Sequence, residues 1–281
     1  MLRLPEHHAS ERCASGVFLK TFTPDAPIEP LRYVHRDDYW VFGVVERGEC
    51  LIGIDFRDWR CRAGKAMVVL PGQVHAFRHG ESLDAMLLFV DASYVPREVQ
   101  LRFAEWARQP APIPLPAAGR EELHRLRLLL EECSADGSDS SCRRLALRHL
   151  ALAAAALLCD AVTEVRPAAG ADRRPAELTA AFRELLASEL CRHRSPSYYA
   201  GRLHVSRSYL CEAVRQTTGL SPSRIIRDEV VLRAKRMLVY STRSVQQIAS
   251  ELGFDDCAYF SRLFTRAASL SPSAFRAKYL E

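Results

Sequence analysis

The chain has 281 residues, of which 48% are hydrophobic and 26% are charged, and its formal net charge is +5. This composition excludes a mostly disordered, collagen-like or coiled-coil protein, and the length suggests about two domains. No run of about 18 uncharged apolar residues occurs, and the N-terminus lacks the apolar core of a secretory signal. We therefore expect a cytoplasmic protein without a membrane span.

The nine cysteines are odd in number and contain no CxxC pair. This pattern argues against a disulfide framework and against a structural zinc site. We expect the cysteines to be small apolar side chains, with a redox sensor as the alternative.

Short β-branched or aromatic segments predict strands between residues 16 and 95. They read GVFLKTF, YWVFGVVE, ECLIGIDF, AMVVLP and AMLLFV, and turn signals such as Arg47-Gly48 and Pro71-Gly72 separate them. Several short strands at this spacing favour a β-sandwich or a barrel.

Two helices are predicted after the proline-rich connector at residues 109–118. Leu123, Leu126 and Leu130 fall on one face of the first helix. Residues 164–175 predict a flexible hinge, and no strand pattern follows it.

The second of these helices, at about residues 140–161, has an unusually broad apolar face. Leu145, Leu152 and Ala156 share helical spacing, and further leucines widen the stripe. A lone surface helix does not need so wide a face. We therefore expect it to pair across a two-fold axis in a homodimer.

The charge is distributed unevenly along the chain. Residues 173–281 hold 18 Lys and Arg against 10 Asp and Glu, a net charge of +8, whereas the preceding residues carry −3. A basic C-terminal part indicates a polyanionic partner.

An internal repeat of about 50 residues lies in this basic part. Residues 209–223 (YLCEAVRQTTGLSPS) and 259–273 (YFSRLFTRAASLSPS) share a tyrosine and the LSPS ending. Each copy predicts a helix–turn–helix, with Ser195 and Ser206 as helix caps in the first copy and Ser244 in the second. A helix at 222–239, about 27 Å long, joins them. Successive major grooves lie about 34 Å apart, so this helix could hold two recognition helices in adjacent grooves.

The second helix of each copy has a core face and an outward face. We expect the core faces to be Tyr209, Leu210, Ala213 and Val214 in the first copy, and Tyr259, Phe260, Leu263 and Phe264 in the second. The outward residues are candidates for contacts with DNA bases and phosphates. They are Arg207, Ser208, Cys211, Glu212 and Arg215, and Cys257, Ala258, Ser261, Arg262 and Arg266.

The segment from Ala200 to Tyr279 resembles the double helix–turn–helix DNA-binding domain of AraC-type transcription regulators. The motifs that carry the resemblance are RAKRML (Arg233–Leu238), IASELGF (Ile248–Phe254), YFSRLF (Tyr259–Phe264) and SPSAFR (Ser271–Arg276). The chain departs from the family at Ser269, where glycine is usual, which predicts a strained helix end. Glu212 also departs from the basic or amide side chain that the resemblance favours, and it would repel phosphate.

The N-terminal region resembles a cupin barrel, which commonly precedes this DNA-binding domain and binds a small effector. GKAMVVLPGQVH, ending at His75, is similar to the second cupin motif, and His35 and Asp37 followed by Glu46 are similar to a degenerate first motif. We expect these four residues and Tyr39 to contact an effector. Two histidines and a carboxylate also form a possible iron site. Because Asp37 replaces an expected histidine, we expect no metal and no cofactor.

The sequence thus predicts an α+β multidomain protein. Residues 1–100 form a cupin-like β-barrel that senses an effector, residues 101–172 form a helical dimerisation region and linker, and residues 173–281 form an all-α DNA-binding domain. The expected partners are double-stranded DNA, an unknown small molecule, a second copy of the chain and RNA polymerase, and no catalytic activity is expected. The alternatives are a cupin metalloenzyme or metal sensor with a DNA-binding tail, and a helical interaction module that binds no DNA.

Overall fold

The computed structural model describes residues 5–7, 16–24, 34–107, 111–135, 140–165 and 173–280. The chain folds into two compact units that separate between residues 167 and 168. Each unit is described by itself.

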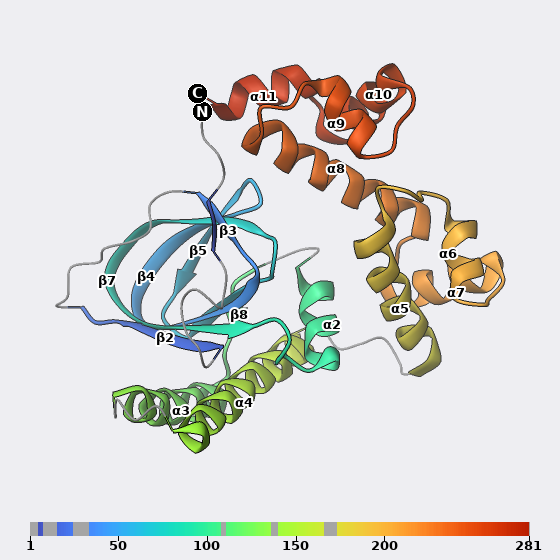
Figure 1. Ribbon diagram of the computed structural model, residues 1–281. Helices are drawn as coiled ribbons and strands as arrows, with labels where there is room; N and C mark the ends of the chain where they lie inside the picture. Colours follow the sequence, from blue (N-terminus) through green and yellow to red (C-terminus); the bar gives the residue numbers. More distant parts are fainter. Residues whose placement is uncertain are drawn as a thin grey trace. The chain divides into compact units, whose positions relative to one another are not determined.

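The first unit is built on one eight-stranded sheet that curls around its own interior (Figure 1). Its strands are β1 (Glu6–His7), β2 (Val17–Phe22), β3 (His35–Asp37), β4 (Tyr39–Ile54), β5 (Arg57–Arg62), β6 (Lys65–Val69), β7 (Val74–Asp91) and β8 (Ile113–Pro114). The long strands β4 and β7 pair antiparallel over most of their length. Strands β2 and β3 also pair with β7, which gathers the sheet around one long strand.

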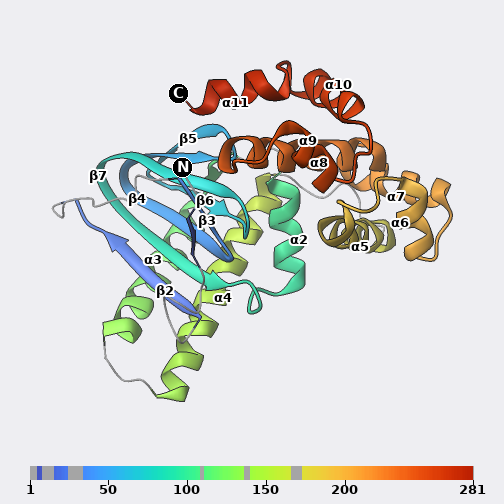
Figure 2. The ribbon, with the colours of Figure 1, turned by 45° about the horizontal axis from the view of Figure 1, so that its top comes forward.

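Three helices pack against this sheet: α2 (Arg97–Trp106), α3 (Ala117–Ala135) and α4 (Ser141–Val165). Figure 2 shows α3 and α4 side by side outside the sheet. Leu123 and Leu130 are buried in the sheet's own core and Leu126 packs against it, which confirms the predicted face of α3. On α4, Ala151 and Leu158 enter the same core, whereas Leu145 is 52% exposed.

Helix α4 is long and apolar enough, over Ser141–Thr163, to cross a membrane by length and composition alone. A helix that belongs to the core of a water-soluble domain passes the same test. Part of the apolar character of α4 comes from side chains buried in the core, such as Ala151 and Leu158. The rest comes from apolar side chains on its outward face, such as Leu145.

The predicted turn at Arg47-Gly48 is wrong. Both residues lie inside β4, where the pairing with β7 shifts register on either side of Arg47. Gly48 has a φ of 71°, and a Cβ there would lie 2.3 Å from the carbonyl oxygens of Glu81 and Ser82. Gly48 therefore allows a local irregularity in the pairing of two continuous strands, and the chain does not reverse there. Pro71-Gly72, in contrast, does form a turn, as predicted.

Two predicted connectors lie partly outside the described residues. Of the connector at 109–118, residues 109–110 are not described, and the remainder holds β8 and the start of α3. Of the hinge at 164–175, residues 166–172 are not described, and a helix already begins at Arg173.

The described residues of the second unit are helical apart from short connections, as predicted. The helices are α5 (Arg173–Glu189), α6 (Pro196–Arg202), α7 (Arg207–Thr218), α8 (Pro222–Tyr240), α9 (Val245–Glu251), α10 (Cys257–Ala268) and α11 (Pro272–Leu280). The pair α6–α7 and the pair α9–α10 lie at opposite ends of α8 (Figure 1). Each pair is one copy of the sequence repeat.

Side-chain caps define where these helices begin. Ser195, Ser206 and Ser244 each accept a hydrogen bond from a backbone N–H in the first turn of α6, α7 and α9, as predicted. Ser244 and Gln247 form a complete capping box. Asp256 caps α10 in the same way. The local sequence therefore fixes the start of both helices in each repeat.

Candidate DNA-binding surface and effector pocket

Helices α7 and α10 each bury one narrow face and expose the opposite face to solvent. Leu210 and Val214 are fully buried on α7, as are Phe260 and Phe264 on α10. The candidate DNA contacts lie opposite. Arg207, Ser208, Glu212, Arg215, Ala258, Arg262 and Arg266 are exposed, and Cys211, Cys257 and Ser261 are half-buried. The structure thus brings the ten predicted residues onto the outward faces of two equivalent helices.

The predicted burial of Tyr259 is wrong, because its side chain is 54% exposed. The core of α10 takes side chains at i and i+4 only, Phe260 and Phe264, and position 259 falls at the edge of this stripe. Tyr209 and Leu263, also expected in the core, are half-buried.

Arg262 makes only a loose ion pair within the protein. Its Nη2 lies 3.7 Å from Oδ2 of Asp256, and both side chains are more than half exposed. Such a solvent-exposed pair contributes at most about 1 kcal/mol. The guanidinium can therefore leave Asp256 for another partner at little cost.

Arg194 ties the segment before the first repeat to the turn of the second repeat. Its guanidinium donates to the carbonyl oxygens of Leu252 and Gly253 and stacks 3.9 Å from the ring centroid of Phe254. At Gly253, φ is 77°, and a Cβ would lie 2.1 Å from the carbonyl oxygen of Cys191. These contacts connect the segment before α6 directly to the turn between α9 and α10, in addition to the connection through α8.

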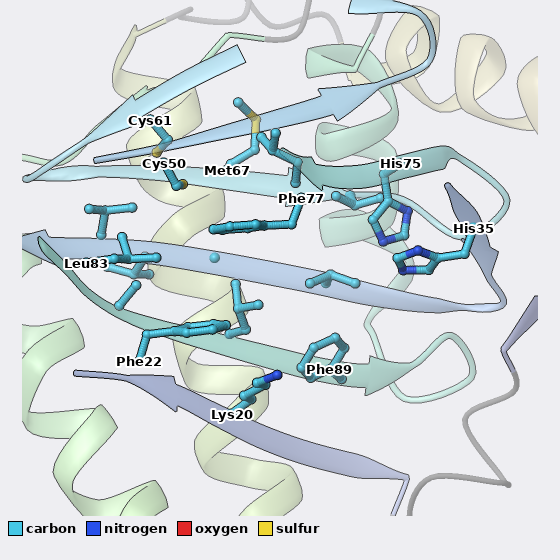
Figure 3. Close-up of a pocket in the computed structure, with 18 of the residues that line it drawn as sticks. Lys20, Phe22, His35, Cys50, Cys61, Met67, His75, Phe77, Leu83 and Phe89 are labelled. Carbon is cyan, nitrogen blue, oxygen red and sulfur yellow. The ribbon is translucent and has the colours of Figure 1, made fainter. Parts of the chain in front are cut away.

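The sheet of the first unit encloses a cavity of about 120 Å³ with mostly apolar walls. Phe22, Met67, Phe77, Leu83 and Phe89 are among the lining side chains. Figure 3 shows His35 and His75 together at one end of this pocket, with Cys50 and Cys61 at the other. Tyr39 also lines the pocket, so three of the five predicted effector contacts reach it.

Asp37 lies close to both pocket histidines, and its side chain is 1% exposed. Its Oδ2 is 3.3 Å from Nε2 of His75 and 3.9 Å from Nε2 of His35. Its Oδ1 is 3.1 Å from Nδ1 of His7, a residue of β1. Burial alone would raise the pKa of the Asp37 carboxyl, but the approach of His75 and the charges of the neighbouring imidazoles hold this pKa below its usual range.

Glu46 does not join this cluster, so the predicted convergence of His35, Asp37, Glu46 and His75 is wrong for Glu46. Its carboxylate lies 3.1 Å from both Arg127 Nη1 and His124 Nδ1 on α3. Arg127 also pairs with Asp84 and Glu131. Glu46 therefore helps to anchor α3 to the sheet.

Two family profiles match the chain. The AraC-like ligand binding domain matches residues 30–154, and the helix-turn-helix domain matches residues 199–278. The chain belongs to the AraC-type transcription regulators. It is therefore a ligand-responsive, DNA-binding regulator of this family, with an N-terminal sheet domain and a C-terminal helical domain.

Among its relatives, the AraC-type chain is 22% identical over 280 residues to the HTH-type transcriptional activator RhaS of Klebsiella pneumoniae, covering 96% of both chains. It is 38% identical over 71 residues to the HTH-type transcriptional activator RhaR of Yersinia pseudotuberculosis, covering 25% of this chain and 24% of RhaR. Among solved structures it is similar to ToxT of Vibrio cholerae, with a TM-score of 0.41 at 13% identity, over 94% of this chain and 98% of ToxT.

Sequence reasoning missed several residues around the pocket of this AraC-type regulator. Lys20 lines the pocket and lies 5.1 Å from the ring centroid of Phe22. Alternation along the strand could have placed Lys20 on the same face as Phe22. The only local signal for His7 was the pair of histidines at positions 7 and 8. Its place beside Asp37 results from the pairing of β1 with β3, a long-range contact that local sequence patterns do not predict.

Proposed function

We propose that α7 and α10 are recognition helices that enter successive major grooves on one side of a DNA duplex. The observation that carries this proposal is the repetition of one outward face at both ends of α8. Helix α8 has 19 residues and spans about 28 Å. This length is comparable to the groove separation of about 34 Å.

Within α10 we assign base recognition to Arg262 and phosphate contact to Arg266. Arg262 lies in the first half of the helix, which reaches base edges in this motif, and its guanidinium can pair with O6 and N7 of guanine. Arg266 lies one turn later, nearer the rim of the groove. On α7, Glu212 occupies the position equivalent to Arg262 and is suited to accept a hydrogen bond from cytosine N4. Arg207 and Arg215 are the basic residues on the outward face of α7.

The test compares Arg262→Ala with Arg266→Ala on a selected operator and a scrambled duplex at several salt concentrations. Arg262→Ala should weaken operator binding about 5- to 150-fold and relax preference at one base pair. Arg266→Ala should weaken both duplexes alike and lower the salt slope by about one unit. Equal losses on both duplexes for Arg262→Ala would remove Arg262 from the base-reading set.

We assign the pocket to effector binding rather than to catalysis, because the chain belongs to a family of regulators. Its apolar walls suit a small, largely apolar molecule, and Tyr39, His35 and His75 supply polar contacts. RNA polymerase is a further proposed partner. We place this activity in the cytoplasm, where the DNA lies.

We further propose that the outward face of α4 forms a homodimer. Leu145 is 52% exposed, and Leu128 and Leu129 on the adjacent α3 are each 45% exposed. Helices α3 and α4 pack against each other, and a second copy that binds α4 could cover exposed leucines of both helices.

A further inference from the structure

We infer that His7, His35, Asp37 and His75 form a binding site for a divalent first-row transition metal at one end of the pocket. Imidazole and carboxylate are ligands that zinc, iron and nickel accept. The site goes beyond the proposed DNA and effector binding, and it depends only on the first unit.

Three of the four candidate ligands lie close enough together to share one ion. The ligand atoms of His7, His35 and Asp37 all lie within 4.8 Å of one another. His75 Nε2 lies 3.3 Å from Asp37 Oδ2. With metal–ligand bonds of about 2.1 Å, two ligand atoms on a tetrahedral ion lie roughly 3.4 Å apart. The ligand atoms of His7, His35 and Asp37 are therefore close enough to share one ion after side-chain rotation. His75 lies next to Asp37 Oδ2 and to the ring of His35, and it would have to turn towards the same ion to become the fourth ligand.

The orientation of the His75 ring leaves one of its nitrogens available as a metal ligand. Its Nδ1 lies 3.2 Å from the carbonyl oxygen of Gln73, which can only accept a hydrogen bond. Nδ1 therefore donates to this carbonyl, which leaves Nε2, the ring nitrogen that faces Asp37, as the atom of His75 that can bind a metal ion. A carbonyl partner of this kind is the usual second contact of a metal-binding histidine.

The carboxylate of Asp37 supplies an independent observation. Its Oδ2 is buried and has no hydrogen-bond partner among the described residues, since the 3.3 Å approach of His75 lacks hydrogen-bond geometry. A metal ion bound by Oδ2 would satisfy this buried oxygen.

Three strands that are distant in the sequence supply these ligands. His7 comes from β1, His35 and Asp37 from β3, and His75 from β7. The site differs from the cupin pattern, because Glu46 lies against α3 and His7 takes part instead. A bound ion would join β1 to the other two strands, and it should raise the unfolding temperature of the first unit.

The experiment titrates Co²⁺ into the full-length, chelator-treated protein and records visible absorption, with Zn²⁺ as competitor. We expect one Co²⁺ per chain, with the absorption bands of a nitrogen- and oxygen-ligated ion that Zn²⁺ displaces. Asp37→Asn and His75→Ala should each weaken binding at least tenfold. His79→Ala changes an exposed histidine on the same strand and should leave binding unchanged.

The outcomes separate the proposal from its rivals. Asp37→Asn keeps the shape of the side chain, and an unchanged tryptophan fluorescence transition will show that the variant is folded. Absence of stoichiometric Co²⁺ binding in the wild type would overturn the proposal, as would equal loss in His79→Ala. Failure of this test leaves DNA binding by α7 and α10 untouched, because those helices belong to the other unit.

Discussion

The ends of α7 and α10 allow a direct measurement of the strain at Ser269. Gly219 and Ser269 follow these helices with φ values of 69° and 59°. Each donates its backbone N–H to a carbonyl four residues earlier, at 2.8 Å. The two caps are therefore equivalent, except that one of them places an L side chain in the left-handed region.

The expected effect of Ser269→Gly follows from two opposing contributions. A non-glycine residue in the left-handed region costs roughly 1–2 kcal/mol. The greater freedom of glycine in the unfolded chain offsets roughly 0.5–1 kcal/mol of the gain. Ser269→Gly should therefore stabilise the second unit by about 0.5–1 kcal/mol. Gly219→Ser should destabilise it by a similar amount, because a Cβ there meets nothing within 4 Å and only the backbone strain remains.

Thermal unfolding of the full-length protein, followed by calorimetry, measures both variants. For a unit of this size, about 0.5–1 kcal/mol shifts the transition by roughly 2–6 °C, upwards for Ser269→Gly and downwards for Gly219→Ser. All three tryptophans, at positions 40, 59 and 106, lie in the first unit, so their fluorescence transition is an internal control. A Ser269→Gly protein that melts at or below the wild-type temperature would refute the reasoning.

Three further results are expected. Leu145→Glu combined with Leu152→Glu should convert a homodimer into a folded monomer, and sedimentation of wild-type protein as a monomer at micromolar concentration would contradict this. Gly253→Ala should destabilise the second unit by roughly 2–4 kcal/mol, since its Cβ would collide with a backbone carbonyl, whereas Gly201→Ala, which has open space, should not destabilise it. Burial raises the pKa of Tyr199 to about 12, so the folded protein keeps a phenol protonated that the unfolded chain ionises near pH 10. Stability should therefore fall as the pH rises above about 10, and Tyr199→Phe should lessen this fall in alkaline denaturation curves.

The helical unit could be predicted closely because its signals are local. Caps such as Ser206 and Ser244 lie within three residues of the N–H groups that they accept from. Apolar periodicity identified the buried face of α7, with Leu210 and Val214. The exposure of Tyr259 was not predicted. Whether a residue at the edge of an apolar stripe is buried depends on the neighbouring helix, which the local sequence does not specify.

The sheet unit was predictable in kind but not in pairing. Strand propensity located β2, β6 and parts of β4 and β7, yet the glycine at 48 suggested a turn that the structure replaces with an irregularity inside a strand. Pairing partners in a sheet are far apart in sequence, so the positions of His7 and Glu46 could not be read from local patterns. The sequence therefore placed His35, Asp37 and His75 together correctly, but it wrongly added Glu46 and left out His7.

The most direct test of recognition by two helices is a footprint of the full-length protein on a selected operator. Hydroxyl-radical cleavage and guanine N7 methylation interference would locate the contacted grooves. We predict, for each protomer, two protected patches on one side of the duplex with centres about 10 base pairs apart. Arg262→Ala should remove interference in one patch, and Arg207→Ala should weaken the other. A single patch per protomer, or two patches that neither substitution changes, would contradict the assignment of α7 and α10.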